Sequence, residues 1–170
     1  MLKARQQGEA DLILTLFSRE YGKLVVRAPG VRRVTSRKRG HLQTFSQVRV
    51  FLARGKTWDV ITEAQSVDNH TLWREDLAKV TAAYTFCELV DKLVPEKQEN
   101  REVYELLVTA LSGLGKAQQA RLDAWQRRFS LRLLEMLGFW PVGEKVDEET
   151  LGLYVKEILE RPLKSGQLLG

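Results

Sequence analysis

The sequence predicts an α+β protein in which a five-stranded β-barrel precedes an all-helical domain. Apolar and polar residues alternate with period two as far as about residue 66, a pattern typical of strands. From about Arg74 the apolar spacing becomes helical. We therefore expect two domains, the first over residues 1–68 and the second over residues 69–170.

Five segments of the first half define the expected strands. They are residues 2–5, 11–18, 23–28, 45–53 and 57–64. The stretch "REYGK" joins the second segment to the third, and its Gly22 predicts a hairpin turn because glycine readily adopts positive φ.

One long connection, Pro29 to Thr44, lies between the third and fourth expected strands and has room for a helix. Five strands with a single long insertion at this point match the order of an OB-fold, a Greek-key barrel that often binds oligonucleotides. An SH3-like barrel, or the barrel-like half of a larger sheet, would give a similar strand count. In the expected OB-fold the barrel interior contains Leu24, Val26, Val48, Val50 and Leu52.

Four helices are expected in the second half. They cover residues 74–94, 101–115, 120–141 and 148–159. The second has a single apolar stripe that should face a core, whereas the first and third have wide apolar faces and should be buried on more than one side. Helices of this kind predict a packed bundle.

No constellation of residues predicts an enzyme, a metal site or a cofactor. One cysteine, Cys87, excludes an intramolecular disulfide and favours a cytosolic location. Together with only two histidines, His41 and His70, it cannot supply the usual zinc ligands. Cys87 lies on an expected buried helix face, the acidic Asp147–Glu149 suits a helix N-terminus, and no P-loop is present. No apolar run approaches the roughly 18 residues of a membrane span.

Positive charge is concentrated in one part of the chain. The segment from Tyr21 to Trp58 holds ten of the 27 Lys and Arg and none of the 22 Asp and Glu, so the remainder, 17 minus 22, is −5. "GVRRVTSRKRG" at residues 30–40 alone contains four Arg and one Lys. Such segregation favours a polyanionic partner over a merely solvated basic loop, because a mixed surface would cancel the field.

The expected binding surface combines the connection with neighbouring strands. Arg suits phosphate because its guanidinium presents a fork of donors and stays charged at any working pH. The expected DNA-binding residues are Lys23, Arg27, Arg32, Arg33, Arg37, Lys38, Arg39 and Arg49, with Arg54 as a further strand cation. Aromatic residues could add base stacking, but the sequence assigns it to none of Phe17, Tyr21, Phe45, Phe51 and Trp58.

Short motifs follow one another between Gly8 and Phe45. They are Glu9-x-Asp11, Gly22-Lys23, Gly30-x-Arg32, Ser36-Arg37 and Leu42-Gln43-Thr44-Phe45. Later, "RRFSLRLLEMLGFWP" ends in a Leu-Gly-aromatic turn, and "RPLKSGQLL" contains Pro-Leu-Lys-Ser. In this order and spacing the chain resembles the bacterial RecO family of DNA repair and recombination mediators over most of its length. Thr44 stands where the family usually has proline.

One region differs from the family pattern. Members are usually longer, with further helices and often a Cys-based zinc site between the Leu-Gly turn and the Pro-Leu-Lys-Ser segment. Here Pro141 to Thr150 bridges that interval without a cysteine. We therefore expect a compact or shortened member that lacks the zinc-site region.

The resemblance implies a function. It implies binding of single- and double-stranded DNA, annealing of complementary strands, and help in loading the RecA recombinase onto DNA covered by single-stranded DNA-binding protein (SSB). It also implies the partners RecR and the acidic C-terminal tail of SSB, and a cytoplasmic, nucleoid-associated location in bacteria. The candidate tail site is Trp125, Arg127, Arg128 and Arg132, although these arginines could equally be the solvated side of a core helix.

Two other functions stay open from the sequence. An RNA-binding or ribosome-associated OB-fold protein without mediator activity would prefer RNA. A membrane-surface protein would bind anionic vesicles, but the basic segment lacks the apolar face of an interfacial helix.

Overall fold

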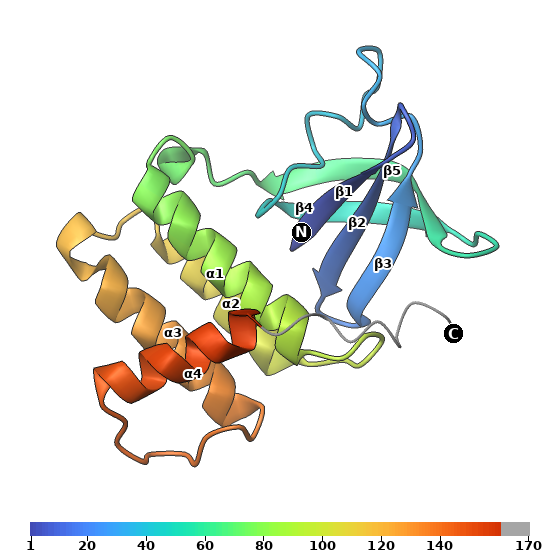
Figure 1. Cartoon of the computed structure of the whole chain (residues 1–170). Coiled ribbons are helices and arrows are strands. Elements are labelled where there is room, and N and C mark those ends of the chain that lie inside the picture. Colours follow the sequence, from blue (N-terminus) through green and yellow to red (C-terminus); the bar gives the residue numbers. More distant parts are fainter. Residues whose placement is uncertain (161–170) are drawn as a thin grey trace.

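The period-two half of the chain folds into one five-stranded sheet in a computed structural model that describes residues 1–160 (Figure 1). The strands are β1 (Lys3–Gln7), β2 (Asp11–Ser18), β3 (Gly22–Ala28), β4 (Gln47–Ala53) and β5 (Asp59–Asp68). They lie in the order β1-β2-β3-β5-β4, and every pair is antiparallel except β3 and β5, which are parallel. This is the expected OB-fold.

The β2–β3 turn depends on glycine, as the sequence predicts. Gly22 has φ +66°, and a Cβ at this position would collide with the backbone carbonyl of Gln98. Any other residue would therefore strain the turn and displace the segment after the first helix.

The barrel core uses residues from the strands and from the long connection. Leu14, Val26 and Ile61 are at most 1% exposed, and Val31 and Leu42 of the connection pack with them. The connection itself forms consecutive tight turns, with hydrogen bonds such as Arg33 N to Gly30 O at 3.1 Å and Ser36 N to Arg33 O at 3.0 Å. It contains no helix, contrary to what its length suggested, and its middle part extends from the end of the sheet away from the helices (Figure 1).

Four α-helices and two 3-10 turns follow in the described part of the chain, up to residue 160. They are η1 (Thr71–Trp73), α1 (Leu77–Leu93), α2 (Arg101–Gly113), η2 (Gln119–Arg121), α3 (Leu122–Met136) and α4 (Glu148–Glu160). Asp76 caps α1 by accepting from the amides of Ala78 and Lys79, and Asn100 caps α2 by accepting from the amide of Val103. The Pro-Leu-Lys-Ser signature lies outside the described residues.

The barrel and the helices share a core. Leu2, Phe17 and Phe45 come from the barrel half, yet they pack into the helical core with residues such as Trp73 and Phe86. The two halves therefore meet through an apolar contact and not through a solvated linker.

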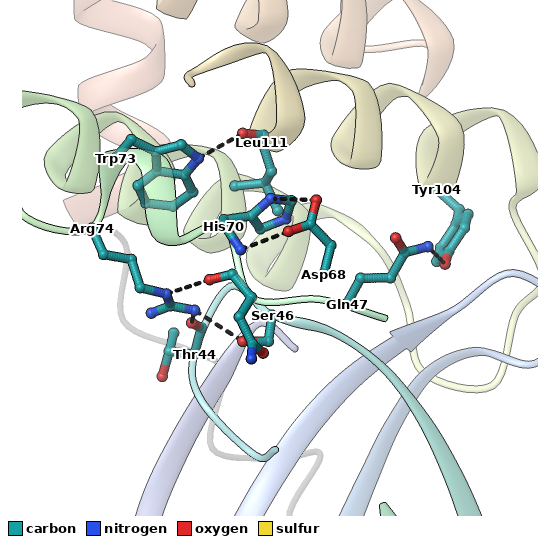
Figure 2. Close-up of polar contacts among 10 residues, drawn as sticks. Thr44, Ser46, Gln47, Asp68, His70, Trp73, Arg74, Tyr104 and Leu111 are labelled. Atoms are coloured by element: carbon teal, nitrogen blue, oxygen red, sulfur yellow. Dashed lines mark hydrogen bonds and ion pairs between the residues drawn. The ribbon is translucent and has the colours of Figure 1, made fainter. Parts of the chain in front are cut away.

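Polar contacts complete this joint (Figure 2). The Arg74 guanidinium donates to Thr44 O at 2.8 Å, to Ser46 Oγ at 2.9 Å and to Asn69 O at 2.5 Å. Trp73 Nε1 donates to Leu111 O at 3.0 Å, which ties the start of the helical half to α2. Arg74 thus holds the end of the long connection against the first helical turn.

Candidate nucleic-acid interface

Two cations of the connection bind it to the barrel. Arg32 Nη1 donates to Glu9 O at 2.9 Å, and its backbone amide donates to Ala10 O at 3.0 Å. Lys38 Nζ donates to Ile61 O at 2.9 Å. Both side chains were expected to contact DNA, and the structure shows that each also has a structural partner.

Three other cations of the connection have no such partner. Arg33, Arg37 and Arg39 are exposed, and none of their side chains forms a hydrogen bond or an ion pair with any residue in the described range 1–160. Their guanidinium groups face solvent, where they can pair with phosphate oxygens without first breaking an internal bond.

Asp11 holds the start of the connection. Its Oδ1 accepts from the Gly30 amide at 2.8 Å, and its Oδ2 accepts from Arg27 Nε at 2.9 Å. The hydrogen bond from Gly30, followed by that from Arg27, lowers the pKa of the Asp11 carboxyl. Arg27 stays about half exposed, at 48% of its side chain, but part of its charge is neutralised.

His41 holds the other end. Its Nδ1 lies 2.9 Å from Ser66 Oγ and accepts from the Ser66 amide at 3.3 Å. The connection is therefore fixed to the barrel at both ends and in its middle, and the unpartnered arginines project from a supported backbone. Supported cations lose less conformational entropy on binding than cations of a free loop.

The cations on and between the strands differ in how far they are exposed to a partner in solution. Arg49 is exposed on β4, and Arg54 and Lys56 are exposed in the β4–β5 turn. Lys23 is only 8% exposed, because it lies against the end of α1. Its Nζ donates to Asp91 O and lies 3.6 Å from an Asp91 carboxylate oxygen. Lys23 is on the exterior of the barrel as expected, but the helical half covers it. It therefore does not add to the exposed positive charge of the connection and the neighbouring strands.

The expected tail-binding residues fall on two sides of α3. A helix advances about 100° per residue, so Trp125, Arg128 and Arg132 share one side while Arg127 points nearly the opposite way. Trp125 Nε1 donates to Ala110 O at 3.3 Å, and its ring packs against Gly113. Arg128 is exposed and has no ion pair within residues 1–160.

Arg127 and Arg132 are both paired with carboxylates. Arg132 Nη1 lies 3.3 Å from Glu135, and Arg127 Nη2 lies 2.9 Å from Glu148. Arg127 lines a pocket of about 420 Å³ between α1, α3 and α4, together with Asp123, Glu148 and Glu149. With three carboxylates and one guanidinium, this pocket is poorly suited to an acidic peptide.

Other chemistry has little support within residues 1–160. No group of three or more His, Cys, Asp and Glu side chains there could hold a metal ion, and no helix there is long and apolar enough to cross a membrane. Burial raises the pKa of the Cys87 thiol to about 12, so this thiol stays protonated and unreactive at neutral pH.

Comparison with known proteins assigns both halves to one family. The family described as "Recombination protein O N terminal" matches residues 1–70, and "Recombination protein O C terminal" matches residues 74–145. Curated proteins named "DNA repair protein RecO" are similar over most of the chain. That of Pelotomaculum thermopropionicum is 38% identical over 85% of this chain and 56% of its own length. The relative from Desulfitobacterium hafniense is 31% identical over 89% of this chain and 57% of its own length.

A third relative of the same name, from Bifidobacterium adolescentis, is 40% identical over 68% of this chain and 48% of its own length. The chain thus spans about half the length of the curated relatives that it matches. The N-terminal and C-terminal family regions occur in order, one on the barrel and one on the helices, and the chain therefore belongs to the recombination protein O (RecO) family.

Proposed function

We propose that this protein binds single- and double-stranded DNA through its basic connection and anneals complementary strands. The observation that carries the proposal is the set of three exposed arginines, Arg33, Arg37 and Arg39, that have no partner within residues 1–160 and project from a connection fixed to the barrel. Phosphate contacts of this kind release condensed counterions and are independent of sequence. The relatives' name, DNA repair protein, supports DNA as the polyanion.

Annealing follows from charge neutralisation. Two complementary strands repel each other until cations screen their phosphates, and a surface that holds both strands raises their local concentration. This step breaks no covalent bond, so we propose that the protein is not an enzyme and needs neither ATP nor a metal ion. In the bacterial cytoplasm, near the nucleoid, such a protein would act as a mediator that helps RecA load onto SSB-coated DNA.

Strand annealing tests this function directly. We expect the purified protein to accelerate annealing of bare and SSB-coated complementary oligonucleotides, without nucleotide and in the presence of a chelator. Binding should weaken steeply with salt and be similar for unrelated sequences. A clear preference for RNA would favour the alternative, an RNA- or ribosome-associated OB-fold protein, and annealing that stops with chelator would contradict the metal-free reading.

The partners RecR and the SSB tail are also part of the proposal, on the strength of the family resemblance. For the acidic tail, charge favours the side of α3 with Trp125, Arg128 and Arg132 over the pocket beside Arg127, which three carboxylates line. On that side Arg128 is the exposed cation without an ion pair among the described residues.

A matched pair of variants tests the tail site. Arg128→Ala should lower affinity for a labelled tail peptide about tenfold, because a hydrogen bond to a charged group contributes roughly 1.5 kcal/mol. Arg127→Ala removes the same charge from the opposite side of α3 and should change the affinity less than twofold. Peptide anisotropy measures both, and an equal or larger loss in Arg127→Ala would place the tail in the pocket beside that residue.

A further inference from the structure

The aromatic side chains of the barrel half differ in whether a base could reach them. Phe17 and Phe45 are 7% and 4% exposed and belong to the helical core, so neither can stack on a base. Tyr21 and Phe51 are exposed, and Trp58 is half-buried at the end of the β4–β5 turn. These three are the candidates for a stacking site.

Tyr21 and Phe51 lie in mixed electrostatic surroundings. Both line a groove between the β2–β3 turn, β4 and α2, where Glu20 and Asp59 contribute carboxylates. Arg19 of the same groove is paired with Glu105 at 3.2 Å. Arg49 also lines the groove, so a DNA strand there would meet the carboxylates of Glu20 and Asp59 as well as this guanidinium.

Trp58 lies on a different face of the sheet. Arg5 is paired across strands with Ile13, and Ile13 with Arg27, so these residues form one row over β1, β2 and β3. Arg27 is in register with Val60, and Trp58, two residues earlier, falls on the same face. The position of Arg5 confirms this, because its guanidinium carbon lies 5.9 Å from the centre of the Trp58 ring.

Four cations lie near Trp58, two on this face of the sheet and two in its own turn. Arg5 and Arg27 project from the sheet, and Arg54 and Lys56 come from the turn that carries Trp58. The neighbouring Asp59 is in register with the buried Val26, so its carboxylate belongs to the opposite face, where it lines the groove. Glu9 and Asp11 are the acids at the β1–β2 turn, and Asp11 is already engaged by Arg27 and Gly30.

The Arg5 side chain covers a ring that a base would cover better. An exposed cation–π contact is weaker than the stacking of a nucleobase on an aromatic ring. An unpaired base can therefore take the place of Arg5 over Trp58, and the released guanidinium can pair with the adjoining phosphate. A base inside a duplex is already stacked and paired, so it cannot reach the ring.

We propose that Trp58 and Arg5 form a stacking site for one unpaired base of single-stranded DNA. The site rests on the proposed DNA binding and adds to it a physical basis for distinguishing single strands from duplexes. Phosphate contacts of the connection act on both forms of DNA, whereas Trp58 acts only on a strand whose bases are free.

Single substitutions at the three aromatic positions test the proposal. We expect Trp58→Leu to weaken binding of an oligo(dT) about tenfold while binding of a duplex with the same number of phosphates changes less than twofold. Phe51→Leu and Tyr21→Leu are the matched controls and should change neither affinity by more than twofold. Trp58→Phe should retain most of the affinity for the single strand, since a smaller ring still stacks.

A second measurement, tryptophan fluorescence, compares the parent with the conservative variant Trp58→Phe. Oligo(dT) should quench the tryptophan fluorescence of the parent, and the quenching should be lost in Trp58→Phe, because Trp73 is 1% exposed and the other two tryptophans lie in α3 and after it. Equal losses for single strand and duplex in Trp58→Leu, or unchanged quenching in Trp58→Phe, would overturn this site alone. If the parent bound neither form of DNA, the proposed function itself would fail.

Discussion

The arginines of the β3–β4 connection and those of α3 differ in what surrounds them. In the connection, the side chains of Arg33, Arg37 and Arg39 are exposed and form no ion pair or hydrogen bond within residues 1–160. In α3, Arg127 and Arg132 each lie within 3.3 Å of a glutamate. Each cluster contains three arginines, but the two clusters present unequal positive charge to a partner.

The difference follows from where the acids of the chain are. Between Tyr21 and Trp58 the chain has no Asp or Glu, so the arginines there could be neutralised only by a distant segment, and the ion pair that Asp11 forms is with Arg27. Around α3 the acids of the same helix and of the α4 N-terminus are close by. A run of cations indicates a binding surface most reliably when its own neighbourhood lacks acids.

The largest effect is expected from removing the unpartnered arginines. Replacing Arg33, Arg37 and Arg39 by Ala should weaken single-stranded DNA binding roughly 100-fold, if each contact contributes about 1 kcal/mol. The slope of log affinity against log salt should fall by about 0.7 for each lost contact. A salt titration by anisotropy measures both quantities.

The charge-matched control for this variant is the triple substitution of Arg127, Arg128 and Arg132 by Ala. It removes the same net charge from α3 and should change DNA affinity less than about threefold, because these residues lie outside the basic surface. Similar losses in the two triple variants would mean that net charge, and not the connection, determines binding.

An intermediate effect is expected at the joint between the two halves. Unlike the exposed arginines, Arg74 forms its hydrogen bonds within the protein: it donates to Thr44 O, Ser46 Oγ and Asn69 O. Arg74→Ala leaves these acceptors unpaired and should lower the free energy of unfolding by about 2 kcal/mol, or the Tm by roughly 4–8 °C. Thermal unfolding checks this, with Arg39→Ala, expected within about 1 °C of the parent, as the exposed control.

The smallest effect is expected at Asp11, whose carboxylate partly neutralises Arg27. Because its hydrogen bonds from Gly30 and Arg27 lower the pKa of Asp11 in the folded state, their stabilisation is fully present above the ordinary carboxyl pKa of about 4. It is lost as the pH falls through the lowered value. Asp11→Asn should therefore be less stable than the parent at neutral pH, and the difference in Tm should shrink below about pH 4.

The same variant sharpens the comparison of the two arginine clusters. Removing the carboxylate beside Arg27 should raise affinity for DNA about twofold at low salt, since one repulsive charge disappears from the basic face. Reduced affinity at unchanged stability would instead mean that Asp11 is needed to position the connection.

Local pattern predicts most of the fold, because alternation and turn chemistry are properties of adjacent residues. The strands, the Gly22 turn and the helices follow from such patterns, and the OB-fold order follows from the position of the long connection. The connection itself was harder to predict, because its turns are held by contacts with Glu9, Ile61 and Ser66 that lie far away in the sequence.

The sequence predicted only in part which of the expected site residues are accessible, because distant segments cover or pair some of them. Alternation correctly assigns Lys23 to the barrel exterior but cannot show that α1 covers that part of the exterior with Asp91. Likewise, helical spacing was not enough to distinguish Arg128 from Arg127, whose partner Glu148 lies on another helix. In the sequence, the signal for Trp58 is its position just after the cations Arg54 and Lys56, although its contact with Arg5 depends on the sheet.

The shared core has a consequence for how the protein can be taken apart. Leu2, Phe17 and Phe45 fold with the helices, so a fragment that ends at Asp68 would expose three large apolar side chains to water and tend to aggregate. Both halves should then melt in a single cooperative transition, with no folded barrel surviving loss of the helices. Experiments that assign activities to one half should therefore use surface point substitutions in the intact chain and not separately expressed fragments.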